Sequence, residues 1–527
     1  MPEQTKEETI IRKELDEDLK KVVKGTGIVF FGSILGTILG LAGTILIARF
    51  YSVEEFGFYG LITFIVTFFI AIASLGLLDG CPRYISYYRG KQDDEKIKST
   101  INSSFILIGM SSAIVTILLF FSADFVANQI FKTEELSILI KIVVIGLPFW
   151  TLILLIISIF RGFESVKEKV YLEYFLLGFI KIPLFVVVIS LGLGFNYILI
   201  AYTVSIVFTF LIAILYLLKN LPEKIKKVKK AVSQTKTLLF FSWPLVFTEL
   251  GFLLLSGSDK IMLGILATKV ELGTYNTSVT IVQYLNVFLV SSVFIFTPIA
   301  SRLFAEYKMD ELKRNYQILT KWLFTLTFPF IIAMFLFPKT IISILFGERY
   351  ILAATALQIF VIAYSIQVFL GPSIATIIVF GKTKIIMYFT LIGGLTNIVL
   401  NYFLIHLYGI EGAAFSTMIS LIFTNGLFSL YLFRISRIHS IRKKFILPVI
   451  LSVLVLVVFY YLISYFQLET FSLLIKMLIC LSIVVFYFIM IVVSKSFDHE
   501  DLSLLLLIER KIGINLNIPK RIIKKFI

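Results

Sequence analysis

The chain has 527 residues and a net charge of +16, and 58% of its residues are hydrophobic whereas only 16% are charged. Its mean hydropathy is +0.96. Soluble domains carry about 25% charged residues, so a soluble fold could not bury this much apolar surface. Two cysteines and three histidines are too few for a disulfide framework or a zinc site, and we expect no metal or cofactor. The composition predicts an all-α polytopic membrane protein.

Apolar runs of about twenty residues, bounded by charged or turn residues, predict membrane-spanning helices. Helices are expected because lipid cannot satisfy backbone polar groups, and no run alternates in the way that a barrel strand does. About fourteen such runs follow one another along the chain: 25–49, 57–80, 101–122, 138–160, 171–192, 196–218, 238–265, 273–299, 318–338, 352–379, 385–405, 411–433, 446–465 and 471–493.

Lysine and arginine concentrate in alternate connections between these runs. Those connections, together with both terminal segments, contain 40 of these residues, and the opposite set of connections contains five. Because basic residues stay on the cytoplasmic side of a membrane, both termini are expected in the cytoplasm. The basic excess therefore indicates topology and contact with anionic membrane lipids, and it does not predict a nucleic-acid partner.

The sequence resembles itself when it is shifted so that Glu55 falls on Glu271. At this shift EFGFY corresponds to ELGTY at the starts of the second and eighth runs. Gly178 and Lys181, in the fifth run, correspond to Gly394 and Asn397 in the eleventh. Each copy has six runs, an even number, so both copies cross the membrane in the same sense. We expect them to be related by an axis along the membrane normal, with a cavity at their interface, as in alternating-access carriers.

The repeat predicts a division of the chain into two six-helix lobes and several smaller segments. Helices 13 and 14 lie outside the repeat. The predicted segments are a cytoplasmic N-terminal tail (1–24), the N-terminal lobe (25–218), a basic cytoplasmic linker (219–237), the C-terminal lobe (238–433), helices 13 and 14 (434–493) and an amphipathic basic cytoplasmic tail (494–527).

Several stretches within residues 20–435 carry a family resemblance. They are GTILIARFYSVEEFGFYGLI, CPRYISYYRGK, SGSDKIMLGILATKVELGTYN, ISILFGERY and GKTKIIMYFTLIGGLTNIVLNYFLIHLYGIEGAAFSTMIS. In them the chain resembles polysaccharide and oligosaccharide flippases, O-antigen flippases among them, of the MATE-related exporter superfamily. The resemblance implies a flippase of the cytoplasmic membrane that moves a polyprenyl-diphosphate-linked oligosaccharide by alternating access. Cell-surface polysaccharide or glycan assembly would be its role, and glycan-assembly enzymes its partners.

A passage for such a substrate has chemical requirements of its own. A sugar diphosphate in hydrocarbon would lose hydrogen bonds and leave two charges unsolvated, so a polar, cationic passage is needed and covalent chemistry is not. The chain has no GxxxxGK[ST] loop for ATP, and we expect a transporter coupled to protons, sodium or the membrane potential. The alternatives are a cation-coupled multidrug exporter of the same superfamily and, more distantly, a membrane-embedded glycan polymerase or glycosyltransferase.

Ionisable residues inside membrane spans are candidates for function. Lys181 lies mid-span and is expected to contact a diphosphate or an acidic sugar, with an ion pair to Glu173 as the alternative. In the seventh run, Glu249 and Asp259 are expected either to bind a coupling ion or proton or to be neutralised by a fixed base. Lys260, beside Asp259, is a further candidate for substrate binding.

The remaining candidates lie nearer to the span ends or are uncharged. Arg49, at the external end of the first run, is expected to contact a substrate phosphate or to anchor its helix at the interface. Asp79 and Arg83 lie at the predicted cytoplasmic mouth, where they are expected either to form the ion pair of an inner gate or to act as topology anchors. Asn397 and Asn401 share one helix face and suit sugar hydroxyls or interhelical hydrogen bonds. Three further charges are interpreted as interfacial anchors: Lys141, Arg161 and Lys476.

Overall fold

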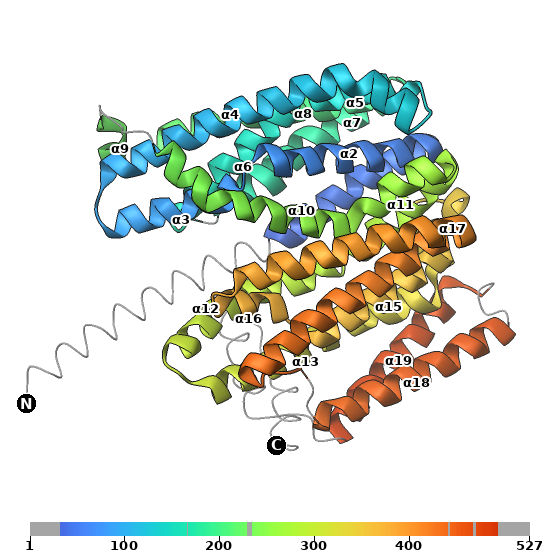
Figure 1. The fold of residues 1–527 in the computed structure, drawn as a ribbon. Helices are drawn as coiled ribbons and strands as arrows, with labels where there is room; N and C mark the ends of the chain where they lie inside the picture. Colours follow the sequence, from blue (N-terminus) through green and yellow to red (C-terminus); the bar gives the residue numbers. More distant parts are fainter. Residues whose placement is uncertain (1–31, 166, 229–233, 441–442, 467–470, 494–527) are drawn as a thin grey trace, which may run out of the picture. The chain divides into compact units, whose positions relative to one another are not determined.

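The structure is a computed structural model, and the part of the chain that it describes is helical without any β-strand (Figure 1). The described residues are 32–165, 167–228, 234–440, 443–466 and 471–493. Two compact units divide them: Met1–Thr280 with Lys384–Ser420, and Ile281–Thr383 with Leu421–Ile527. The predicted tails, 1–24 and 494–527, lie outside the described residues. The predicted lobe boundaries stay a prediction.

The first unit begins with the apolar helix Gly32–Phe50. Its further elements are α2 (Val53–Ala73), α3 (Leu77–Gly90), α4 (Asp94–Phe125), the π-helical turn η1 (Val126–Ile130), α5 (Glu135–Val144), α6 (Leu147–Gly162), the π-helical segment η2 (Lys169–Leu176), α7 (Leu177–Ser190), α8 (Phe195–Asn220), α9 (Glu223–Lys227), α10 (Thr235–Leu266) and α11 (Lys269–Gln283). The short helix α9 falls inside the predicted basic linker.

The second unit consists of the later helices. They are α12 (Asn286–Ala305), α13 (Met309–Leu336), α14 (Pro338–Leu345), the 3₁₀ segment η3 (Glu348–Ala353), α15 (Ala354–Leu370), α16 (Ser373–Val379), α18 (Lys443–Tyr465) and α19 (Leu473–Val493). The helix α17 (Thr383–Ser436) contributes residues 384–420 to the first unit and its last turns to the second.

Eleven helices in the described part of the chain are long and apolar enough to cross a membrane. One of them, the 54-residue α17, contains Gly409 with a non-helical φ of 55° and ψ of −127°. This break separates the predicted runs 385–405 and 411–433, so α17 is expected to cross twice. The all-helical, multi-pass class is confirmed, while the count of fourteen and the side on which the termini lie stay predictions.

A glycine interrupts the second predicted run. The helix α2 ends at Ala73 and α3 begins at Leu77, and between them Gly76 has a φ of +68°. A Cβ atom on Gly76 would lie 2.1 Å from the carbonyl oxygen of Ser242 in α10. Any other residue would therefore clash here as well as adopt a strained backbone. The predicted span is thus two helices joined at a close contact with α10.

The core of the first unit lies among α3, α4, α6 and α8, which pack against one another. Its fully buried residues come from all four helices: Leu77, Cys81, Ile85, Ile101, Ile108, Ile153, Ile156, Ile159, Ile206 and Ala213. Apolar burial of this extent fixes the helices around one another. The same packing fixes the positions of the helix ends. Two of the sites described below lie at these ends.

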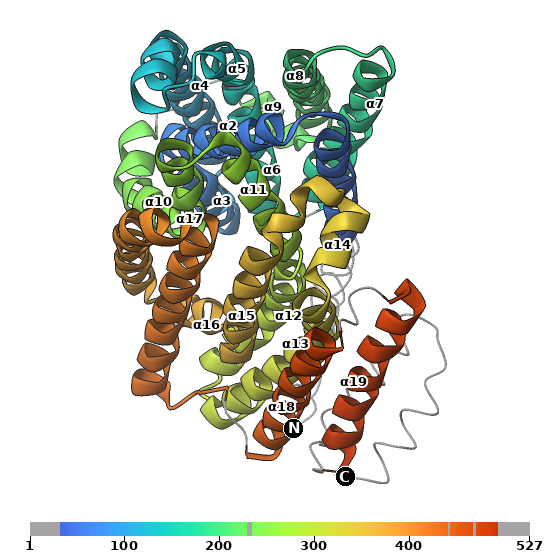
Figure 2. The same cartoon turned by 90° about the vertical axis from the view of Figure 1, so that its right-hand side faces the viewer.

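The second unit has a core of its own, in which α13 packs against α15, α18 and α19. In this core the rings of Phe324 and Phe328 are stacked, and Tyr487 lies tilted against Phe328 with the ring centroids 4.5 Å apart. The helices α18 and α19 form a pair (Figure 2). Large apolar side chains are exposed along α19: Leu473, Leu474, Met477, Leu478 and Leu481. Such exposure is expected of a helix that faces lipid.

The sequence repeat has a structural counterpart at the starts of α2 and α11. Ser52 and Glu55 form a capping box, with N–O distances of 3.1 and 2.8 Å. Their counterparts in the second copy, Thr268 and Glu271, repeat it at 3.2 and 2.8 Å. Such a box satisfies amide groups that a helix start leaves free. The same local sequence therefore starts the same element in both copies.

The two capped helices cross at equivalent glycines. A Cβ atom on Gly57 would lie 2.7 Å from the amide nitrogen of Gly273, and one on Gly273 would lie 1.9 Å from the carbonyl oxygen of Val53. The backbones touch because neither residue has a side chain. The Asn276 amide also donates to the Phe56 carbonyl at 3.4 Å. This contact joins α2 and α11 within the first unit.

Candidate functional site

A buried carboxylate forms the centre of a polar cluster in the first unit. Asp259, in α10, is 1% exposed. Its carboxylate accepts hydrogen bonds from the hydroxyl of Tyr275 in α11 and from that of Thr417 in α17, the latter at 3.3 Å. The backbone N–H of Lys260 donates to the other oxygen at 2.8 Å. Three elements of the first unit thus hold one acid inside an apolar environment.

Amides and hydroxyls extend this cluster between α10 and α17. The Ser258 hydroxyl donates to Asn397 Oδ1 at 2.6 Å, and the Asn401 amide donates to the same oxygen at 2.9 Å. Asn397 in turn donates to Thr417 Oγ1 at 3.2 Å. Asn397 and Asn401 are fully buried, and Asn401 Oδ1 has no hydrogen-bond partner among the described residues. We name Ser258, Asp259, Tyr275, Asn397, Asn401 and Thr417 the Asp259 cluster.

The predicted pairing of Asn397 and Asn401 on one helix face is confirmed, because they bond to each other and, through Asn397, to α10. Of the two uses considered for them, the structure shows interhelical hydrogen bonding. Contact of these amides with sugar hydroxyls stays a prediction, and it requires a conformational change that exposes Asn397 and Asn401. The cluster presents carboxylate, amide and hydroxyl oxygens, and such hard ligands suit a small hard cation or a proton.

Among the described residues no basic side chain forms an ion pair with Asp259, although the charge of Lys260 acts on it electrostatically. Lys260 contacts it through its backbone, and its half-buried side chain forms no ion pair with a described residue. An unpaired buried charge is costly. The hydroxyl and N–H donors reduce that cost, and binding of a cation or a proton would remove it. Both expectations for Asp259, binding of a coupling ion or proton and neutralisation by a fixed base, stay predictions.

Lys181 lies in α7, against the helix Gly32–Phe50. A Cβ atom on Gly43 would lie 3.4 Å from Lys181 Cε and 3.7 Å from Nζ, so the lysine packs in van der Waals distance of this position. The alternative ion pair of Lys181 with Glu173 is wrong, since Glu173 pairs with Lys169 one turn away at 4.0 Å. Lys181 forms no ion pair or hydrogen bond with a described residue and remains half-buried.

The predicted ion pair of Asp79 and Arg83 is also wrong. Asp79 pairs with Arg161 of α6 at 2.6 Å, and Arg161 also donates to the Leu78 carbonyl. Arg83 instead lies over the ring of Phe241 in α10, 3.9 Å from its centroid. Helical spacing places Asp79 and Arg83 one turn apart, but the packing of α3 on α6 and α10 gives each a different partner. A gating role for either residue stays a prediction.

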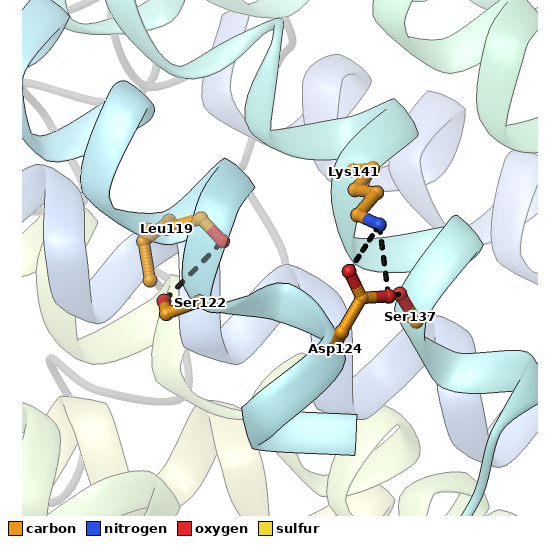
Figure 3. A network of polar contacts seen from close by, with 5 residues as sticks. All are labelled: Leu119, Ser122, Asp124, Ser137 and Lys141. Carbon is orange, nitrogen blue, oxygen red and sulfur yellow. Dashed lines mark hydrogen bonds and ion pairs between the residues drawn. The ribbon is translucent and has the colours of Figure 1, made fainter. Parts of the chain in front are cut away.

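Arg161 is therefore more than an anchor, and Lys141 likewise has a defined partner. Lys141 donates to both oxygens of Asp124, at 2.8 and 2.7 Å, and Ser137 donates to the same carboxylate (Figure 3). These bonds join α5 to the end of α4. In the second unit, Lys476 donates to Thr340 Oγ1 at 2.8 Å. All three cations near span ends are bonded to their surroundings.

Two further candidates lie apart from the Asp259 cluster. Glu249 is half-buried in α10 and has no hydrogen bond or ion pair with a described residue. Arg49 is exposed at the end of the helix Gly32–Phe50. Coupling through Glu249 and phosphate binding by Arg49 stay predictions. The described residues contain no group of three or more His, Cys, Asp or Glu that could hold a metal ion.

Sequence reasoning missed three members of the cluster, namely Ser258, Tyr275 and Thr417. Tyr275 was visible as the last letter of ELGTY, and Ser258 as the neighbour of the acid. Neither signal identifies a partner, because both types of residue are common in helices. Thr417 lies 158 residues from Asp259, and only packing brings them together.

The described helices and their candidate spans define an all-helical, multi-pass membrane protein. The sequence matches the family described as polysaccharide biosynthesis protein over residues 22–304, and the family described as MatE over residues 244–403. The first match spans more than half of the chain, so the chain belongs to the polysaccharide biosynthesis protein family. It is a multi-pass protein of the cell membrane.

Known proteins are similar to this chain in sequence or in fold. An uncharacterised membrane protein of Methanocaldococcus jannaschii is 25% identical over 83% of this chain and 89% of its own length. An inward-facing multidrug resistance MATE family transporter has a TM-score of 0.66 at 17% identity, over 76% of this chain and 95% of its own. Lipid II flippase MurJ in an inward closed conformation has a TM-score of 0.63 at 17% identity, over 87% of this chain and 98% of its own.

Proposed function

We propose that this protein is a flippase for a lipid-linked oligosaccharide, carried on a polyprenyl diphosphate, and serves cell-surface polysaccharide or glycan assembly. Its family and the flippase fold support transport of such a substrate. The observation that carries the proposal is Lys181, a cation inside a membrane-spanning helix without an anionic partner among the described residues. A diphosphate headgroup supplies that anion and is stabilised by it.

The polyprenyl chain would remain in the bilayer while sugars and diphosphate cross through the protein. The predicted cavity between the two lobes would provide this path, with Arg49 and Lys260 as further phosphate contacts. Glycan-assembly enzymes would then receive the substrate on the outer side. None of these steps requires covalent chemistry, because the headgroup changes sides without a bond being made or broken.

Ion coupling is the second part of the proposal. A sodium ion or a proton at the Asp259 cluster would neutralise the buried carboxylate, and its release would return the acid to its three hydrogen-bond donors. Glu249 is the other acid predicted to couple. Replacing each acid separately by its amide tests which one is used: the variant that loses the sodium or pH dependence of transport identifies the coupling residue.

The decisive experiment measures flipping in vesicles. The purified protein is reconstituted with a fluorescent oligosaccharide on polyprenyl diphosphate, and accessibility to an external quencher is followed over time. Wild-type protein is expected to flip the lipid. Lys181→Met should slow flipping about tenfold or more, since a charge-assisted hydrogen bond contributes about 1.5–3 kcal/mol. Lys476→Met, which removes a lysine that is already bonded to Thr340, is the matched control and should retain transport.

The same vesicle assay distinguishes an oligosaccharide-lipid flippase from a multidrug exporter of the same superfamily. The MatE match over residues 244–403 favours a cation-coupled multidrug exporter as the second candidate function. Export of a fluorescent cationic drug, together with failure to flip the oligosaccharide lipid, would establish that alternative. Normal flipping by Lys181→Met would remove Lys181 from the substrate path.

A further inference from the structure

A second polar site lies at the other end of the first unit, outside the proposed transport path. A cavity of about 460 Å³ opens where α3 and α6 end, α4 begins, and α8 leads into α9. Figure 1 shows α9 beside the start of α4, and the two are in contact. By the distribution of basic residues, these ends are on the predicted cytoplasmic side. The volume falls within the range of about 300–1,000 Å³ for small-molecule sites.

The cavity contains an unsatisfied carboxylate. Glu168 is 2% exposed and lines the cavity. One of its oxygens accepts a hydrogen bond from the Tyr216 hydroxyl at 3.3 Å, and the other has no hydrogen-bond partner among the described residues. A buried acceptor left without a donor is destabilising, and more so if it is charged. A ligand that brings a cationic donor would recover this free energy.

Aromatic side chains surround this carboxylate. Phe160, Phe163 and Tyr216 line the same cavity, and the rings of Phe160 and Tyr216 lie edge to face with centroids 5.5 Å apart. An ammonium group is attracted both by aromatic rings and by a carboxylate. The inner part of the cavity is therefore suited to a primary amine.

The opening of the cavity has the opposite charge. Arg89, Lys167 and Lys224 line it and are exposed. Arg89 pairs with Glu164 at 2.8 Å, whereas Lys167 and Lys224 form no ion pair with a described residue. Asp94 also lines the cavity and adds one negative charge. Two lysines without ion pairs near a membrane surface are suited to a phosphate group.

We propose that this cavity binds an amino-phosphate headgroup, with the amine at Glu168 and the phosphate at Lys167 and Lys224. The headgroup belongs either to a membrane lipid of the phosphatidylethanolamine type or to a soluble ester with the same two groups. The site goes beyond the proposed transport function. The second sequence copy does not repeat it, because the counterparts of Glu168 and Arg89 are Lys384 and Ala305. The transport scaffold therefore does not require these residues.

Native mass spectrometry of the full-length protein in a non-ionic detergent tests the proposal. Phosphatidylethanolamine, phosphatidylglycerol and free glycerophosphoethanolamine are titrated separately. The wild-type protein should bind phosphatidylethanolamine at least about tenfold more tightly than phosphatidylglycerol, because only the former brings an amine to Glu168. If glycerophosphoethanolamine binds as tightly as the lipid, the ligand is the soluble ester. If it binds far more weakly, the lipid is the ligand.

Variants assign the binding to this cavity. Glu168→Gln should abolish the preference for the amine, and Lys224→Gln, an exposed position that cannot disturb the core, should weaken both phospholipids about equally. Lys226→Ala is the matched control in α9, since its ammonium group bonds to Glu223 and the Lys219 carbonyl and does not line the cavity. Equal binding of the two phospholipids by the wild-type protein, or unchanged binding by both site variants, overturns the proposal.

Discussion

The fifth and eleventh predicted spans occupy the same place in the two sequence copies, but they carry different chemistry. A Cβ atom on Gly178 would lie 3.0 Å from Leu39, in the first predicted span, and one on its counterpart Gly394 would lie 2.7 Å from Leu254, in the seventh. Each copy therefore packs its fifth helix on its first helix through a glycine. Next to this shared contact, the first copy has the lone cation Lys181 and the second has the Asp259 cluster.

Position by position, the first copy keeps one polar group of the Asp259 cluster, since Tyr59 corresponds to Tyr275, and differs at the others. When Glu55 is aligned with Glu271, the corresponding pairs are Ala42 and Ser258, Gly43 and Asp259, Lys181 and Asn397, Phe185 and Asn401, and Ala201 and Thr417. Gly43 lies against Lys181, just as Asp259 joins the network that contains Asn397. One backbone arrangement thus holds a fixed cation in one copy and an acid that can attract a cation in the other.

Among variants that alter the difference between the two copies, Asp259→Asn is expected to have the largest effect on transport. The amide keeps the volume but removes the charge, so a cation is no longer attracted and transport should fall about tenfold to hundredfold. Flipping rates in vesicles at several sodium concentrations and pH values measure the effect. Ser256→Ala, in the same helix, removes a hydroxyl that bonds to the Phe252 carbonyl within α10 and serves as the control. Full activity of Asp259→Asn would contradict ion coupling at this cluster.

Gly43→Asp gives the first copy the acid of the second. The new carboxylate would be within reach of Lys181 and would pair with it, so the cation would no longer be available to a substrate diphosphate. We expect flipping to slow about tenfold, equivalent to about 1.4 kcal/mol, without loss of folded protein. Gly43→Ala is the control, because its Cβ atom would be 3.4 Å from Lys181 Cε. Equal flipping rates for Gly43→Asp and Gly43→Ala would show that the charge of Lys181 is not needed for transport.

Asn397→Ala tests the stability of the cluster rather than its charge. It deprives Ser258 and Asn401 of their common acceptor and Thr417 of a donor. Loss of buried partners of this kind costs about 1–3 kcal/mol of unfolding free energy. Thr396→Ala, which removes a hydroxyl bonded within its own helix, should change it by less than about 0.5 kcal/mol. Thermal unfolding in detergent compares the Asn397→Ala and Thr396→Ala variants. Equal melting temperatures for the two would show that the network contributes no stability.

The smallest effect is expected where the two copies are alike. Ser52→Ala and Thr268→Ala each remove the first residue of a capping box, and each should cost about 1 kcal/mol. The two losses should be similar, because both boxes share the same two backbone hydrogen bonds, and Thr268→Ala should cost slightly more because the Thr268 hydroxyl also donates to Glu271 Oε2 at 2.8 Å. Hydrogen exchange at the first turns of α2 and α11 measures them locally, and a marked difference between the two variants would indicate that the capped starts are not equivalent.

Much of the fold could be predicted because it depends on patterns along the chain. The apolar runs correspond to helices, and the repeat places capping boxes at Ser52 and Thr268. Helix interruptions were less visible: the predicted run 57–80 is divided at Gly76, because a tertiary contact with Ser242 decides that position. The Lys169–Glu173 pair could have been found, since its members are spaced one helical turn apart on a single helix.

The candidate site was predicted in part. Asp259, Asn397 and Asn401 were identified as polar residues inside spans, and the structure brings all three together with Ser258, Tyr275 and Thr417. Their partners could not be predicted. A polar residue inside a span must satisfy its hydrogen bonds, but the sequence does not state which neighbouring helix satisfies them.

The sequence by itself determined that this is a helical, multi-pass membrane protein, and it predicted two like-oriented copies, because hydropathy, loop charge and an internal offset are one-dimensional properties. Only the tertiary structure decided which charges meet. Asp79 joined Arg161, Arg83 joined Phe241, and Asp259 joined Tyr275 and Thr417. The reason is physical: the rotation and depth of each helix follow from packing against its neighbours, and a helix pattern specifies a face without specifying what that face contacts.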